Sequence, residues 1–440
     1  MTQTKRRRLE EDVVTSNLEV KDLPVERHLL SRRDFLISGV LTSAIVLSPL
    51  LGRAMEPERR TKMTFIYPEK GQMELEARSL MAGFDLSFQE NGPCPVDILR
   101  KTYDQSLDVV LQEIQGSLRD ADVNLIVCVA DVEGSKKAVE KFAKSRAIVF
   151  LTNPSIELVC GEICLPNVFR SSPNNYVLAE PLAPWAVMNA GMKVFITGDD
   201  NRDTNEQADS FAFGFERAGG AFCDRVMVGS ASGSIDSVVS SIRNSDADFV
   251  FAAFEKESAL KFLQSMNTGD SQTRKTIIGP ETLTLFNKMD QAVEETVTGV
   301  PTLTNIANVE SLRSKISSKS DSMALSISRV AEGYDLGGII DSLANGGASG
   351  PPDFETLIKT VSNSKINGMR GEFRFDKNHD AVVDSWVVTW AKDSKELRRK
   401  IVASLGASVS LDFGCGNVGY PNRPDAAPVE SEGVWEENAN

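Results

Sequence analysis

Residues 192–281 contain four short runs, each a predicted strand, that decide the fold: Lys193-Val-Phe-Ile-Thr197, Ala221–Val228, Phe249-Val-Phe-Ala-Ala253 and Thr276-Ile-Ile278. Each run has the length of a strand, and a stretch with helical periodicity separates each run from the next. Strands that alternate with helices at this spacing predict a parallel sheet with helices on both of its faces. The nearly continuous apolar character of Phe249–Ala253 indicates a strand that is buried on both sides.

The ends of two of these helices can be located from the sequence. Ala208, Phe211 and Phe215 recur at helical spacing, and Gly219-Gly220 then ends that helix because glycine readily takes a left-handed conformation. Ser234 is suited to cap the next helix through its hydroxyl group. Ligands of such sheets bind beyond the carboxyl ends of the strands, so the residues that follow each run are candidates for a binding site.

Residues 62–170 repeat this arrangement. Four predicted strands cover 63–67, 96–103, 124–129 and 147–151, and three predicted helices cover 74–89, 106–118 and 134–143. The chain is therefore predicted to be an α/β protein with two doubly wound, Rossmann-like lobes and a cleft between them. After residue 281 we expect helices at 309–316, 322–343 and 354–361, strands at 297–303, 372–375 and 382–391, and a disordered tail over 416–440.

Charge and residue usage argue against several classes of function. The chain has 48 Lys and Arg against 62 Asp and Glu, a net charge of −14, whereas nucleic-acid binding requires a basic surface. His28 and His379 are its two histidines, which argues against a Ser-His-Asp triad or a histidine-based metal site. No CxxC pair, Walker loop or dinucleotide fingerprint is present. We therefore expect no enzyme activity, no cofactor and no metal.

Residues 1–54 are predicted to be a leader and not part of the fold. Arg32-Arg33 precede a modest apolar run from Leu36 to Leu51, and Gly52-Arg53-Ala54 closes the run with small residues. This pattern resembles a twin-arginine signal peptide, which directs export to the periplasm. The run has about 16 residues, fewer than the roughly 20 that a membrane-spanning helix needs. An uncleaved membrane anchor is the alternative.

Export to an oxidising compartment would permit disulfides among the six cysteines. Cys160 and Cys164 are close together in a loop-like stretch and form the favoured candidate pair, although spacing alone does not determine connectivity. Cys128 lies in an apolar run and is predicted to be a buried thiol.

Three motifs carry a resemblance to a known family. They are Gly219-Gly220 with Asp236 heading the following helix, Gly279-Pro280-Glu281 after a strand, and Gly368-x-x-Gly371-x-Phe373-x-Phe375-Asp376. In this order, over residues 62–392, the chain resembles the type I periplasmic binding proteins. Within that family it is similar to the substrate-binding proteins of ABC transporters for branched-chain amino acids, amides and urea.

The resemblance implies where the lobes begin and end, and the sequence departs from the family at two points. Lobe one would comprise 62–172 plus 303–366, and lobe two 173–302 plus 367–415, with three crossings forming the hinge. Pro68-Glu-Lys-Gly71 replaces the small-residue turn that is usual after the first strand, and Asp203-Thr204 replaces the usual Tyr-Gly after the fifth. These departures concern the ligand class and not the fold.

In lobe one, the resemblance implies that hydroxyls and backbone N–H groups hold the carboxylate of a ligand. Ser135, Thr152, Asn153 and Ser155 match those positions, at a helix start and a strand end. The alternative is that Ser135 is only a helix cap and that the other three residues form only a turn.

In lobe two, the resemblance implies contacts to the nitrogen end of the ligand. Phe254 and Glu255 follow a strand where the family often has an aromatic or polar contact. Glu281 matches a carboxylate that pairs with a ligand ammonium group. For Glu255 the alternative is a side chain that simply faces solvent.

The leading hypothesis is a periplasmic solute-binding protein. It would capture a small polar ligand of the amino acid, amide or urea class between its lobes and deliver it to the membrane permease of an ABC transporter. A ligand sensor of the same fold that acts on a receptor or regulator is the alternative, and an exported enzyme is less favoured because no catalytic constellation is found. The twin-arginine translocase would be a further partner during export.

Overall fold

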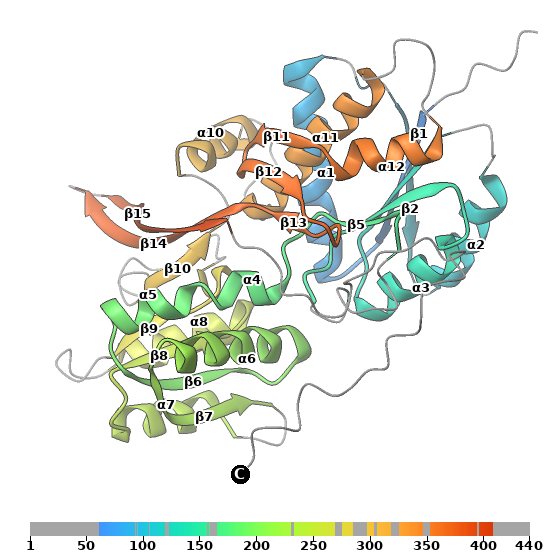
Figure 1. Ribbon diagram of the computed structural model, residues 1–440. Coiled ribbons are helices and arrows are strands. Elements are labelled where there is room, and N and C mark those ends of the chain that lie inside the picture. The colour runs from blue at the N-terminus through green and yellow to red at the C-terminus, as the bar shows by residue number, and fades with distance from the viewer. Residues whose placement is uncertain are drawn as a thin grey trace, which may run out of the picture. The chain divides into compact units, whose positions relative to one another are not determined.

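The computed structural model describes most of the chain between residues 61 and 407 (Figure 1). The described residues are 61–92, 94, 96–104, 106–118, 123–155, 158, 165–229, 233–268, 275–284, 297–302, 306–317, 325–345, 353–393 and 396–407. All of them belong to one compact unit, residues 56–440.

The first sheet has five parallel strands in the order β2-β1-β3-β4-β5. Their bounds are β1 Thr61–Pro68, β2 Asp97–Tyr103, β3 Val123–Cys128, β4 Ala147–Leu151 and β5 Val168–Arg170. Every residue of β3 and β4 is buried, as their mostly apolar sequences predict for central parallel strands. Strand β5 is short, and all of its residues are buried.

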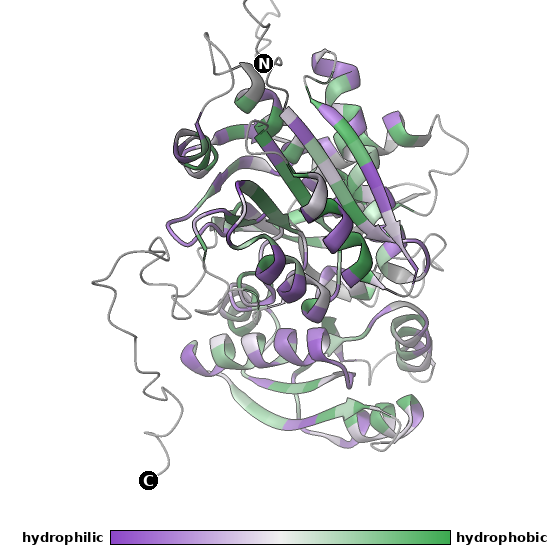
Figure 2. Ribbon diagram, turned by 90° about the vertical axis from the view of Figure 1, so that its right-hand side faces the viewer, coloured by the Kyte–Doolittle hydropathy of each residue, from purple (hydrophilic) through white to green (hydrophobic). Residues whose placement is uncertain are grey.

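Helices cover both faces of this sheet. They are α1 Gln72–Asn91, α2 Leu107–Ser117, α3 Val132–Phe142, α11 Ile327–Asn345 and α12 Phe354–Ser362. One core cluster joins the sheet to α1, α11 and α12, and a second joins it to α2 and α3 (Figure 1). Apolar and polar residues alternate along the helices, as expected where one side of each helix is buried (Figure 2).

Two glycines allow α1 and α11 to cross closely. A Cβ atom on Gly83 would lie 1.8 Å from the carbonyl oxygen of Val330, and one on Gly333 would lie 1.8 Å from that of Leu80. Because both obstacles are backbone atoms, neither position accepts a side chain unless the helices separate. This crossing fixes the start of α11, which contributes to the site described below.

The second sheet has seven strands in the order β15-β14-β10-β9-β8-β6-β7. The strands β6 Lys193–Asp199, β7 Ala221–Val228, β8 Phe249–Ala253, β9 Thr276–Ile278 and β10 Val297–Thr302 are parallel. The hairpin of β14 Asp384–Asp393 and β15 Glu396–Ala407 joins β10 in antiparallel orientation. The remaining elements in this part of the chain are α4 Asn175–Ala179, α5 Leu182–Asn189, α6 Arg202–Arg217, α7 Ile235–Asn244, α8 Lys256–Asn267, the short 3-10 helix η4 Glu281–Thr284 and α10 Ile306–Ser317.

A third, small sheet has the order β11-β12-β13, with β11 Lys365–Gly368, β12 Gly371–Phe375 and β13 Ala381–Val382. Gly368 pairs with Gly371 at the turn of the β11-β12 hairpin. Phe373 and Phe375 pack in the core cluster of the first sheet. The division of the chain into two lobes stays a prediction.

Most predicted elements are present, and several others were missed. Helices α4 and α5 lie in a stretch that was not assigned, because Pro184 and the lack of periodicity hide α5, although proline is tolerated in a first helical turn. Strand β15 was missed because it begins with charged residues that do not alternate with apolar ones. The predicted cap Ser234 is confirmed, since its hydroxyl accepts the N–H of Ser237 at 3.3 Å.

Some predictions fall outside the described residues. These are the leader 1–54 with Arg32 and Arg33, the pair Cys160 and Cys164, and the tail 416–440. Cys128 is confirmed as a buried thiol, and burial raises its pKa to about 12. In the part of the chain that is described, no helix combines the length and the apolar character needed to cross a membrane.

Candidate functional site

Ser135 lies within the first turns of α3, beyond the carboxyl end of β3. The cap of this helix is Asp131, whose carboxylate accepts the N–H of Gly134 at 2.7 Å, so the interpretation of Ser135 as a helix cap is wrong. The hydroxyl of Ser135 is fully buried and donates to the carbonyl oxygen of Ala130 at 3.3 Å. Ser135 therefore holds the loop between β3 and α3 in this structure.

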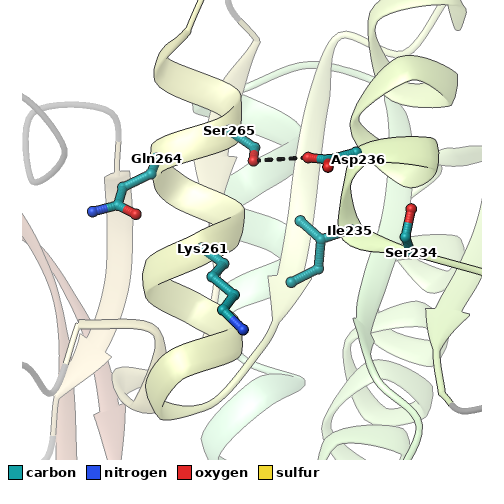
Figure 3. A pocket seen from close by; sticks show the side chains of 6 residues that line it. All are labelled: Ser234, Ile235, Asp236, Lys261, Gln264 and Ser265. Carbon is teal, nitrogen blue, oxygen red and sulfur yellow. Dashed lines mark hydrogen bonds between the residues drawn. The ribbon is translucent and has the colours of Figure 1, made fainter.

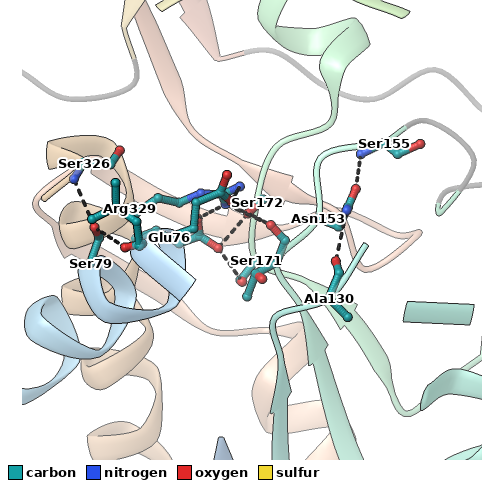
Figure 4. Close-up of polar contacts among 12 residues, drawn as sticks. Glu76, Ser79, Ala130, Asn153, Ser155, Ser171, Ser172, Ser326 and Arg329 are labelled. Carbon is teal, nitrogen blue, oxygen red and sulfur yellow. Dashed lines mark hydrogen bonds and ion pairs between the residues drawn. The ribbon is translucent and has the colours of Figure 1, made fainter. Parts of the chain in front are cut away.

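Thr152, Asn153 and Ser155 follow β4 and lie beside that loop (Figure 4). The amide of Asn153 donates to the same Ala130 carbonyl at 3.1 Å, and its oxygen accepts the N–H of Ser155 at 2.9 Å. Asn153 thus forms an Asx turn, which is the turn considered as the alternative. The structure brings Ser135 and Asn153 together at one backbone oxygen.

Ser155 connects the ends of the two large sheets. Its hydroxyl donates to one carboxylate oxygen of Glu206 at 2.7 Å, and the amide of Asn175 donates to the other at 2.8 Å. Glu206 lies on α6, the helix that follows β6 of the second sheet. A carboxylate from the second sheet therefore meets the predicted ligand-binding loop of the first.

Arg329, at the start of α11, was missed by the sequence analysis (Figure 4). Its guanidinium donates to the backbone oxygen of Thr152 at 2.8 Å, to the hydroxyl of Ser172 at 2.5 Å, and to the carboxylates of Glu332 at 2.8 Å and Glu76 at 2.9 Å. Burial alone lowers the pKa of Arg329, but the two carboxylates raise it above its usual value overall. The side chain is therefore a permanent cation.

Glu281 begins η4 directly after β9 and is half-buried. Its carboxylate accepts a hydrogen bond from the hydroxyl of Ser328, the residue before Arg329 on α11. The structure thus places Glu281 beside the same helix start that holds the Arg329 cluster. This contact joins the second sheet to α11, which packs on the first sheet.

Phe254 and Glu255 follow β8. Phe254 is fully buried in the core, with its ring stacked on that of Phe262 at a centroid distance of 4.6 Å, so its side chain is not exposed to a ligand in this structure. Glu255 is half-buried at the cap position of α8, and its backbone N–H donates to Asp199 at 2.9 Å. Its carboxylate makes no cap hydrogen bond.

Asp203 also lies at this edge, in the first turn of α6. The sequence marked this position only as a departure from the usual Tyr-Gly. Burial raises the pKa of Asp203, and the carboxylates of Glu206 and Glu76 raise it further, against the opposing effect of Arg202 and Arg329. Asp203 is thus within electrostatic reach of groups from both sheets.

A separate groove of about 400 Å³ lies between α7 and α8 (Figure 3). It is lined by Ser234, Ile235, Asp236, Lys261, Gln264 and Ser265. The carboxylate of Asp236 accepts the hydroxyl of Ser265 at 3.1 Å, which ties the two helices together. No predicted ligand contact lines this groove, so it is distinct from the candidate site.

The described residues contain no group of three or more His, Cys, Asp and Glu side chains that could hold a metal ion. The candidate site is instead an array of hydroxyls, amides and carboxylates around one buried guanidinium. Such an array can bind a small polar molecule by hydrogen bonds and charge.

Comparison with protein families decides the classification, because residues 61–395 match a family model described as periplasmic binding protein. The chain belongs to this family. Membership confirms the resemblance seen in the sequence and the predicted α/β fold. No curated protein sequence matches the chain.

Solved structures of this periplasmic binding protein fold are similar along most of the chain. A Sphaerobacter thermophilus ABC transporter substrate-binding protein has 16% identity, covers 81% of this chain and 100% of its own, and has a TM-score of 0.69. A Brucella ovis leucine-, isoleucine-, valine-, threonine- and alanine-binding protein has 13% identity, covers 83% of this chain and 100% of its own, and has a TM-score of 0.65. A Rhodopseudomonas palustris solute-binding protein in complex with benzoate has 15% identity, covers 81% of this chain and 99% of its own, and has a TM-score of 0.63. These likenesses show the type I fold.

Proposed function

We propose that this periplasmic binding protein is the solute-binding component of an ABC transporter. It captures a small polar ligand of the amino acid or amide class between its two large sheets and delivers it to a membrane permease. The observation that carries the proposal is that polar side chains at the ends of both sheets already meet. Ser155 of the first contacts Glu206 of the second, and Glu281 of the second contacts Ser328 of α11.

The ligand's oxygen end is assigned to the loops after β3 and β4. The hydroxyls of Ser135 and Thr152 donate to carbonyl oxygens, at 3.3 Å each, which orients the loops. Backbone N–H groups, together with Asn153 and Ser155, are the contacts that such oriented loops offer to a carboxylate or carbonyl. On binding, the hydroxyl of Ser155 would donate its hydrogen bond to the ligand in place of Glu206.

The ligand's nitrogen end is assigned to Glu281, with Glu255 nearby at the end of β8. As water is excluded, a half-buried carboxylate is stabilised most by a partner that carries positive charge or N–H donors. The hydroxyl of Ser328 supplies one donor, and an ammonium or amide group would supply more. Phe254 would contribute only its backbone, because its ring is in the core.

The test is a thermal-shift screen of the full chain, followed by calorimetry on each hit. The panel contains amino acids, amides, urea and aromatic acids, because the similar structures include one with benzoate and one named for aliphatic amino acids. Binding of an amino acid or amide with micromolar or tighter affinity supports the proposal. Saturable binding of aromatic acids alone contradicts the assigned ligand class.

We also propose that the protein reaches the periplasm by the twin-arginine route. Arg32 and Arg33 are the residues that the export receptor would recognise. Replacing both with lysine is expected to leave the precursor in the cytoplasm, which fractionation and immunoblotting would show. Undiminished periplasmic protein in the double variant contradicts this route.

A further inference from the structure

Among the described side chains, the candidate site has many more carboxylates than cations. The carboxylates are those of Glu76, Asp199, Asp203, Glu206, Glu255, Glu281 and Glu332, and the cations in contact or electrostatic range are the guanidinium groups of Arg202 and Arg329. A ligand that enters such a site without positive charge would meet mostly repulsive or neutral partners. The site's own electrostatics therefore bear on the class of ligand.

Arg329 does not offset this excess for a negatively charged ligand. Its terminal nitrogens already donate to Glu76 and Glu332 as well as to Thr152 and Ser172. A benzoate-like anion would have to displace one of those carboxylates from a buried cation, and breaking such a pair is costly. The guanidinium is therefore better suited to fixing the two glutamates than to binding an anion.

Asp203 is the carboxylate in this group that lacks a partner. Within the described residues it forms no hydrogen bond or ion pair, although it is half-buried. It lies one turn before Glu206 and Gln207 on α6, and the side chains of those two residues contact Asn175. Asp203 therefore shares the face of α6 that points toward the ligand-binding loops.

The electrostatic surroundings of Asp203 come from both sides of the site. Glu206 lies on its own helix, Glu76 on α1, and the cations Arg202 and Arg329 on α6 and α11. Burial and the two glutamates raise the pKa of Asp203 despite those cations. A positive group on a ligand would relieve this unfavourable interaction.

We propose that the ligand carries two cationic nitrogens, one held by Glu281 and the second held by Asp203. The solute then carries two ammonium groups, as a basic amino acid does; an aliphatic diamine has the same two groups but lacks the oxygen end assigned above. This inference rests on the proposed function, because it names the ligand class of the same site. It gives a physical role to the aspartate that stands where the usual family pattern has an aromatic residue.

Calorimetry on the full chain tests this inference with lysine, ornithine and 1,4-diaminobutane against leucine, glutamine and benzoate. We expect a dication to bind at least roughly tenfold more tightly than leucine or benzoate, in line with the typical value of a partly buried charge pair. Preference for an amino acid over the diamine would show that the oxygen end of the ligand is also recognised. The reverse preference would identify a diamine as the source of the two charges.

Variants of α6 supply the second measurement. Asp203→Asn is expected to weaken dication binding by roughly thirtyfold or more and to leave binding of a neutral amino acid nearly unchanged. Asp209→Asn is the matched control, because Asp209 is exposed on the same helix and pairs with Arg225. For the wild type, dication affinity should fall as the pH drops through the raised pKa of Asp203, since protonation removes the charge.

The outcomes separate this inference from the proposed function. Tight binding of leucine or glutamine with no preference for dications overturns the inference and leaves the proposed function standing. Unchanged dication affinity in Asp203→Asn also overturns it. A chain that binds none of the amino acids, amides or diamines overturns both.

Discussion

Two regions of the molecule differ in whether a carboxylate that is shielded from solvent has a charged partner. At the turn between β11 and β12, Arg370 and Asp335 are 1% and 0% exposed, and their side chains are 2.6 Å apart. Asp335 also accepts the N–H of Met369 at 2.6 Å. At the candidate site, Asp203 is half-buried and has no such partner among the described residues. The comparison separates a charge pair that is satisfied within the fold from a carboxylate that is not, and the proposed ligand would supply the partner of that carboxylate.

A second buried ion pair lies around β5 and β13, although the Nη1 atom of Arg170 has no hydrogen-bond partner among the described residues. Arg170 pairs with Asp380, at 2% and 5% exposure of the two side chains, and also donates to the backbone oxygen of Asn378. These contacts fasten the turn after β12 to the end of β5. In a region of low dielectric such a pair is costly to break but adds little compared with apolar packing, so its value lies in specifying one arrangement.

The largest expected effect comes from breaking the satisfied pair. Asp335→Ala leaves Arg370 buried without its carboxylate and is expected to lower the free energy of unfolding by about 3–5 kcal/mol. Chemical denaturation of the full chain measures the change. Ligand affinity of the folded variant should remain near that of the wild type. A loss of stability below about 1 kcal/mol would mean that the pair does not hold the fold.

The second effect is on binding. Glu281→Gln keeps the shape of the side chain but removes its charge, and is expected to cost about 2–5 kcal/mol of affinity for an ammonium ligand, roughly thirtyfold or more. Calorimetry with the best ligand from the screen gives this value. A neutral amide should lose less. Equal affinities of the two proteins would show that Glu281 does not contact the ligand.

The third effect is the pH dependence of stability from His379. Burial lowers the pKa of His379 to about 4; the carbonyl of Val168 opposes this shift, and the charge of Arg170 adds a smaller lowering effect. The ring stacks on Phe169 at 4.1 Å and contacts the Ser362 hydroxyl at 3.0 Å. Folding therefore keeps His379 neutral, and its full contribution to stability is present above the unfolded pKa of about 6.5.

As the pH falls from 6.5 toward 4, His379 becomes protonated in the unfolded chain but stays neutral in the folded chain. Between pH 6.5 and 5 this should lower the free energy of unfolding by roughly 2 kcal/mol. His379→Asn should flatten that slope, because asparagine does not titrate and tolerates the positive backbone φ of 62° found there. Parallel slopes for the two proteins in denaturation experiments would contradict the assignment.

The smallest effect is expected at the exposed pair of Asp209 and Arg225. Asp209→Asn should change the free energy of unfolding by less than about 1 kcal/mol, because solvent screens an exposed ion pair. Ligand affinity should not change. If Asp209→Asn lost as much free energy of unfolding as Asp335→Ala, burial of an ion pair would not explain its contribution to stability.

The sequence predicted strand positions well where a run is apolar throughout. Strands β8 and β9 have the predicted bounds, because a central parallel strand must be apolar on both faces and that pattern is local. Strand β7 also has its predicted bounds, although it is an edge strand whose residues are exposed or half-buried. It also placed Glu281 directly after a strand end. It failed for Phe254, because position after a strand does not reveal whether a ring turns outward or stacks on Phe262 in the core.

The sequence by itself thus determined the parallel strands of the two large sheets, most of their helices and the strand ends from which the candidate site is built. Tertiary structure alone decided that Arg329 reaches Thr152, 177 positions away, and that Phe373 and Phe375 pack with the first sheet. The reason is physical. Periodicity records which face of an element is buried, whereas the partner of a polar side chain depends on how distant elements cross. Those partners distinguish a charge that holds the fold from one that is available to a ligand.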